Sequence, residues 1–186
     1  MFEKIADFQN SKCWKIVYGI VGTITSIVAA FLTLFVFVTV ISRYVFKSDI
    51  FGSEEIILLF AWWMYFIGAI GGSMEDSQIK ADMIDVFVSN KAIVDACKGI
   101  AGILEFVVFT LSSVLAARFV ATNFVKMPVT TGLRIPMVCL QIPLVIGFFG
   151  MAIFGLYWGL YYAARSSYRR KGGIVEADIP AEGGEA

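Results

Sequence analysis

The chain alternates between long apolar runs and short charged segments. Four runs contain at most one charged side chain each and cover residues 16–42, 56–74, 99–117 and 135–164. At about 1.5 Å of rise per residue, the shortest run would form a helix roughly 28 Å long, close to the ~30 Å hydrocarbon thickness of a bilayer. The pattern therefore predicts an all-α integral membrane protein with four transmembrane helices, of which the longest are tilted.

The segments around these runs predict a simple domain organisation. Residues 1–15 mix apolar and charged side chains, which is typical either of an amphipathic helix on the membrane surface or of a polar lead-in. Residues 77–95 repeat apolar side chains at helical spacing and predict a second interfacial helix. Residues 16–171 would form the membrane domain, residues 126–134 a loop within it, and residues 172–186 a disordered tail. Ser53 is expected to cap the second transmembrane helix.

Charge distribution predicts the orientation of the helices. With four spans both termini share one side, which would carry ten of the fifteen lysines and arginines, whereas the other side would carry five. Because cytoplasmic loops are enriched in lysine and arginine, we expect both termini in the cytoplasm.

Composition narrows the possible functions. The chain is 59% hydrophobic and has formal net charge +0, so nothing indicates a nucleic-acid partner. It contains no histidine, which argues against histidine metal sites, histidine bases and bis-histidine haem anchors. Three scattered cysteines favour neither a disulfide framework nor zinc. We expect a protein that is not an enzyme and holds no cofactor or metal.

One carboxylate and one amide lie inside the predicted spans. Glu105 is the only carboxylate well within one, and an ionised acid in lipid requires a partner, a proton or water. It would either serve as an ion ligand in an autonomous carrier or channel, or bond a polar group on a neighbouring helix near the membrane surface. Gln141 is expected to form a hydrogen bond between helices.

Other residues are candidates for contact with partner proteins. Arg43, Glu54 and Glu55 flank the first connection on the side away from the termini, where they would either pin two helix ends or dock a partner. Trp62 and Trp63 lie in the middle of a span, although tryptophan favours its ends. Together with small residues, a proline and two further acids, these make up the candidate interface set: Arg43, Glu54, Glu55, Trp62, Trp63, Gly68, Gly72, Asp82, Glu105, Pro143, Gly155 and Gly159.

The order of several motifs resembles a known family. The motifs are Arg43 after the first span, Ser53-Glu54-Glu55 opening the second, a tryptophan-rich core with Gly68, Asp82 beyond it, and a Leu-x-Ile-Pro step at residues 140–143. In this order within a four-span chain, they are similar to the small membrane subunit (Q, or DctQ-type) of TRAP transporters, over roughly residues 43–147. Gln78 stands where the family commonly has a histidine, so no role of that histidine is carried over.

The resemblance implies partners and a function. The small subunit would form a complex with a large transmembrane subunit that moves its substrate by a sodium-driven elevator motion. A periplasmic binding protein would deliver the substrate, an organic acid such as a C4-dicarboxylate or sialic acid. The resemblance implies a scaffold in the bacterial inner membrane that contacts lipid and does not transport alone. An autonomous carrier that uses Glu105 is the alternative.

Overall fold

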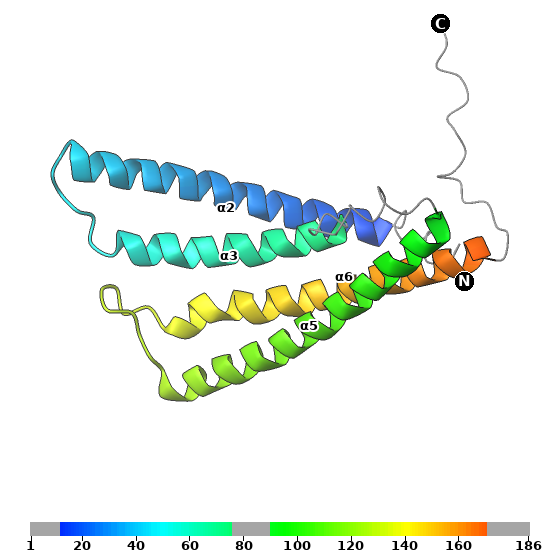
Figure 1. The fold of residues 1–186 in the computed structure, drawn as a ribbon. Helices are drawn as coiled ribbons and strands as arrows, with labels where there is room; N and C mark the ends of the chain where they lie inside the picture. The colour runs from blue at the N-terminus through cyan, green and yellow to red at the C-terminus, as the bar shows by residue number, and fades with distance from the viewer. Residues whose placement is uncertain (1–11, 76–89, 171–186) are drawn as a thin grey trace, which may run out of the picture.

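The computed structural model describes residues 12–75 and 90–170, which form four long helices (Figure 1). All four are long and apolar enough to cross a membrane. The predicted all-helical class with four membrane-spanning helices is therefore confirmed. The bounds are α2 (Lys12–Tyr44), α3 (Ser53–Met74), α5 (Lys91–Lys126) and α6 (Met137–Arg170). Most of the two predicted interfacial segments, the predicted tail and Asp82 lie outside the described residues.

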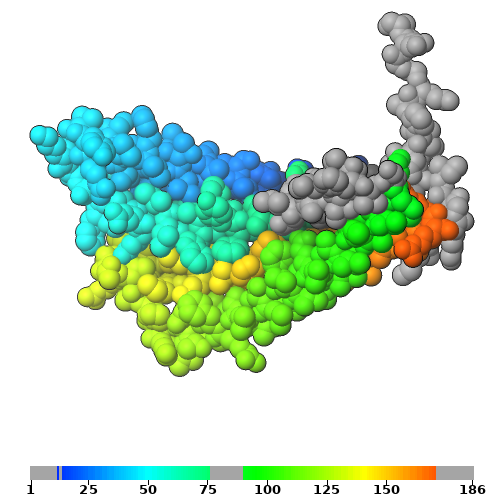
Figure 2. All heavy atoms as spheres, in the orientation of Figure 1, coloured from blue at the N-terminus to red at the C-terminus, as the bar shows by residue number. Residues whose placement is uncertain are grey.

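The helices form a row rather than a closed bundle (Figures 1 and 2). Within the described residues, backbone packing joins α2 to α3, α3 to α6, and α6 to α5. The rings of Trp14 on α2 and Tyr157 on α6, 5.2 Å apart, add a link between the two at one end. Within residues 12–75 and 90–170, the row leaves large apolar side chains such as Leu34 of α2 and Leu111 of α5 exposed.

Glycines bring α5 and α6 into backbone contact where they cross. A Cβ atom added at Gly102 would lie 2.6 Å from the backbone nitrogen of Gly159, and one at Gly99 would lie 3.1 Å from that of Ala163. Only glycine permits so close an approach, as is usual where membrane helices cross. Beyond the crossing the two helices diverge toward the loop that joins them (Figure 1).

Glycines on α6 also receive side chains from α3. Phe66 packs over Gly147 and Ile70 over Gly150, each so closely that a Cβ atom on the glycine would clash. At the far end of α3, the indole nitrogen of Trp158 donates a 2.9 Å hydrogen bond to the carbonyl of Ser73. These contacts place α6 between α3 and α5 in the row, and they bury Trp158.

Two connections between helices lie together at the same end of the helix axes (Figure 1). They are residues 45–52 between α2 and α3, and residues 127–136 between α5 and α6. We call this the loop end, and the opposite end, where α2 begins and α6 finishes, the terminus end. The predicted loop is thus present. The predicted cap at Ser53 is wrong: the cap position is Gly52, with φ 75°, and Ser53 is the buried first residue of α3. The backbone there takes the left-handed conformation that glycine adopts without strain.

Candidate functional site

The loop end is organised around the carboxylate of Glu55. Glu55 lies in the first turn of α3 and accepts three hydrogen bonds from the connection between α5 and α6. The donors are the hydroxyl of Thr130 at 2.6 Å and the backbone N–H groups of Gly132 at 2.6 Å and Leu133 at 2.8 Å. One side chain of the first helical hairpin therefore holds the loop of the second.

The loop that Glu55 holds is itself ordered by backbone hydrogen bonds. The N–H of Thr130 donates to the carbonyl of Ile135, and the N–H of Met137 donates to the carbonyl of Pro128, both at 2.9 Å. Leu133 at the tip packs against Gly52, where an added Cβ atom would lie 2.4 Å from the leucine side chain. The two connections thus form a single ledge, defined here as residues 49–55 and 130–134.

An exposed ion network joins the end of α2 to this ledge. The guanidinium of Arg43, at the end of α2, contacts Asp49 at 2.6 Å and Glu54 at 3.5 Å. The side chain of Glu54 is 85% exposed and that of Asp49 is 68% exposed. Such exposed pairs contribute little to stability, so the network is better suited to presenting charge than to holding the fold.

A shallow polar hollow of about 250 Å³ joins the network to the ledge. Its walls come from both hairpins and include Arg43, Asp49 and Glu54 on one side and Thr131 and Gly132 on the other. The loop end therefore combines a loop whose backbone is held by Glu55 with exposed charges of both signs.

Replacing Glu55 with glutamine should release the loop from α3. The amide has only one acceptor oxygen, and because Gly132 and Leu133 donate to different carboxylate oxygens, its NH₂ group would face one of these two N–H donors. We expect faster backbone hydrogen exchange across residues 129–136, measured by mass spectrometry in detergent.

Glu54→Gln is the matched control, because Glu54 lies in the same helical turn but pairs with Arg43 and accepts no hydrogen bond from residues 127–136. Equal exchange in both variants would show that Glu55 does not hold the loop.

The two candidate tryptophans lie halfway along α3. Trp62 lines an apolar hollow of about 440 Å³ together with Leu58, Tyr65 and other α3 residues, and its ring is 5.8 Å from that of Phe66. Tyr65, beside it, is 71% exposed. Trp62 and Trp63 are both half-buried. The aromatic side chains thus form a partly open surface on α3.

Small residues from the candidate set are used for packing inside the chain. Gly155 and Gly159 are buried at the crossing with α5, Gly68 faces Thr25 of α2, and Pro143 is fully buried within α6. Gly72 lines a narrow groove of about 240 Å³ between α2 and α3. The structure places these five residues between its own helices and away from the ledge.

The carboxylate and the amide within the predicted spans also lie between α5 and α6. Glu105 is half-buried, and an added Cβ atom at Gly155 would lie 3.3 Å from its Cγ. Gln141 is buried and accepts a 2.8 Å hydrogen bond from the side-chain amide of Asn123, so the expected interhelical bond is present. Glu105 lies nearer the terminus end and Gln141 near the loop end, so the structure does not bring them together.

The sequence analysis missed a buried ion cluster at the terminus end. The carboxylate of Asp95 on α5 contacts the guanidinium of Arg169 at 3.1 Å and that of Arg165 at 3.5 Å, both on α6. The side chains of Asp95 and Arg169 are 7% and 9% exposed. Ser166, between the arginines, donates a 2.8 Å hydrogen bond to the carbonyl of Ala92. The spacing of Arg165 and Arg169, four residues apart on one helix face, was the available signal.

These features define a class of protein. Four membrane-spanning helices are joined by a braced ledge at one end and a buried ion cluster at the other, and residues 12–75 and 90–170 hold no group of side chains suited to a metal ion. The class is a multi-pass membrane protein.

The comparison with protein families identifies the chain more closely. A family model described as "Tripartite ATP-independent periplasmic transporters, DctQ component" matches residues 32–160. The chain belongs to this family, as the motif order had indicated. The family is a transporter component, not an enzyme, in assemblies that also contain a large subunit and a binding protein. No curated protein and no solved structure matches the chain.

Proposed function

We propose that this chain is the scaffold subunit of a sodium-coupled transporter that imports an organic acid such as a C4-dicarboxylate or sialic acid. It braces a large elevator-type subunit in the bacterial inner membrane and helps to dock the periplasmic binding protein. Family membership is the observation that carries the proposal.

The row of helices supports a bracing role. In the described residues α2 packs along α3, and α5 along α6, so the helices do not close around a central path. The exposed apolar side chains are suited to lipid and to a neighbouring membrane subunit. A protein of this shape can hold a large subunit in place without itself carrying a solute.

The proposed orientation places the ledge in the periplasm and both termini in the cytoplasm. The terminus end carries more lysine and arginine than the loop end, which favours its retention in the cytoplasm. The ledge would then face the binding protein, and Trp62 and Trp63 would be available to the large subunit within the membrane.

Reconstitution tests the function. Proteoliposomes should take up labelled dicarboxylate or sialic acid only when they contain this chain, the large subunit, the binding protein and an inward sodium gradient. Vesicles with this chain alone should show no uptake above empty vesicles. Uptake by the chain alone, with its loss in Glu105→Gln, would instead support the autonomous carrier.

Charge reversal tests the ledge as a docking surface. The double variant Arg43→Glu and Glu54→Lys reverses exposed charges without touching the Glu55 bridge. We expect several-fold slower uptake, most evident at low ionic strength, because peripheral charges mainly steer association.

Co-purification of the large subunit with the double variant is the control. If the membrane complex assembles and uptake stays normal at all salt concentrations, the ion network has no part in docking.

A further inference from the structure

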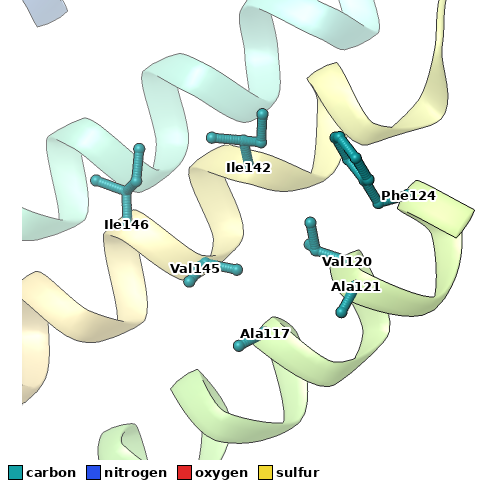
Figure 3. Close-up of a pocket in the computed structure, with 7 residues that line it drawn as sticks. All are labelled: Ala117, Val120, Ala121, Phe124, Ile142, Val145 and Ile146. Atoms are coloured by element: carbon teal, nitrogen blue, oxygen red, sulfur yellow. The ribbon is translucent and has the colours of Figure 1, made fainter.

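The loop end of the α5–α6 hairpin contains an apolar hollow that opens on the membrane. It has a volume of about 480 Å³ and is lined by three or four side chains from each helix (Figure 3): Ala117, Val120, Ala121 and Phe124 of α5 and Ile142, Val145 and Ile146 of α6. Every lining side chain is a hydrocarbon. Two of the four lining residues of α5, Ala117 and Ala121, are alanines, which leave the space between the diverging helices unfilled.

The hollow is bounded along the helices. Toward the terminus end, the glycine crossing brings α5 and α6 into backbone contact. Toward the loop end, the hydrogen bond from Asn123 to Gln141 joins the helices again. A transmembrane helix is roughly 10 Å across, so the hollow equals the volume of only about one helical turn. It is too small for a helix of another subunit, whereas a flexible hydrocarbon chain can enter it from the bilayer.

Unpaired positive charge surrounds this part of the hairpin. Arg118, Lys126 and Arg134 are exposed and form no ion pair or side-chain hydrogen bond with the part of the chain that the structure describes. Arg43, Arg165 and Arg169, by contrast, all contact carboxylates. The sequence holds no aspartate or glutamate from residue 106 to residue 175, so the hairpin supplies no acid of its own.

Lys126 and Arg134 lie at the loop end of the hairpin, beyond the hollow. Lys126 is the last residue of α5, two positions beyond Phe124 of the hollow, and Arg134 lies in the loop two positions before Pro136. Arginine and lysine at helix ends extend to the interface and bind lipid phosphate. The apolar hollow would suit an acyl chain of a phospholipid, and the two basic side chains would suit its phosphate.

We propose that this hairpin binds one phospholipid from the leaflet at the loop end. One acyl chain occupies the hollow between α5 and α6, and Lys126 and Arg134 bind the phosphate. The bound lipid fills the gap that opens where the helices diverge, so it supports the α5–α6 hairpin beneath the ledge. The site requires neither the transport partners nor the proposed function.

Photo-crosslinking of the full chain in vesicles tests the acyl-chain site. The probe is phosphatidylglycerol with a diazirine near the end of one acyl chain, diluted into phosphatidylcholine vesicles, with adducts mapped by mass spectrometry. We expect adducts on the lining residues of α5 and α6. Ala121→Phe should reduce them about tenfold, whereas Ala101→Phe, an exposed alanine elsewhere on α5, should leave them unchanged. An adduct yield that does not change in the Ala121→Phe variant would overturn the proposal.

Lipid titration monitored by native mass spectrometry tests the phosphate site. The double variant Lys126→Gln and Arg134→Gln should bind phosphatidylglycerol roughly 25-fold more weakly, which corresponds to about five-fold for each cation removed. Lys47→Gln removes an exposed cation from the other loop and should have no effect. An equal loss in both variants would mean non-specific attraction and would overturn the site. Disappearance of the adducts in the complex with the large subunit would assign the hollow to a protein interface.

Discussion

Asp95→Asn should destabilise the protein more than any other change of a single polar group described above. The substitution keeps the size of the side chain but leaves Arg165 and Arg169 beside a neutral amide. Because removal of one partner leaves the other charges buried, breaking a buried ion pair typically costs 3–5 kcal/mol. Because asparagine can still form hydrogen bonds to the arginines, we expect the free energy of unfolding to fall by about 3 kcal/mol, the lower limit of this range. Thermal unfolding in detergent measures the change.

Asp49→Asn is the control for this prediction. Asp49 also pairs with an arginine, but its side chain is 68% exposed, so its loss should barely shift the unfolding midpoint. If both variants unfold at the wild-type temperature, the cluster of Asp95 with two arginines does not hold α5 to α6.

Gly102→Ala should force α5 and α6 apart. The new Cβ atom would lie 2.6 Å from the nitrogen and 2.7 Å from the Cα of Gly159, and neither backbone atom can move without moving α6. Overpacking a fitted contact typically costs 1–3 kcal/mol, and we expect roughly 3 kcal/mol here because both surfaces are backbone. Thermal unfolding in detergent measures the loss.

Gly19→Ala provides the comparison on α2, where an added Cβ atom would meet nothing within 4 Å. Alanine is the better helix former, so this variant should be at least as stable as the wild type. A Gly102→Ala protein as stable as Gly19→Ala would contradict the backbone contact between α5 and α6.

The sequence predicts the four helices well because a membrane span has a strong local signal. Each span needs a long uncharged run, and such runs are visible without any knowledge of tertiary contacts. The interhelical role of Gln141 was predictable for a related reason, since an amide in lipid requires a partner. Helix ends were less predictable: α5 extends from Lys91 to Lys126, well beyond its apolar run, because isolated charged residues such as Lys98 and Arg118 do not end a helix.

The contacts at the loop end and at the terminus end could not be predicted in the same way. Glu55 bonds residues that follow it by 75 to 78 positions, and no local pattern at residues 130–133 indicates that partner. Asp95 was assigned to an interfacial segment, and Arg165 and Arg169 were considered only among the lysines and arginines that set the orientation. Each of those interpretations considered one helix alone, whereas the ion cluster depends on how α5 crosses α6.

The order of contacts along the row bears on biogenesis. The interfaces between α2 and α3 and between α5 and α6 each join neighbours in sequence, so each hairpin can assemble as soon as its second helix has left the translocon. The α3–α6 interface joins segments that are far apart in sequence and must wait until synthesis is nearly complete. We expect nascent chains halted after α3 to contain the α2–α3 hairpin already paired. The hydrogen bonds from the loop to Glu55 would form only after the α5–α6 hairpin has emerged.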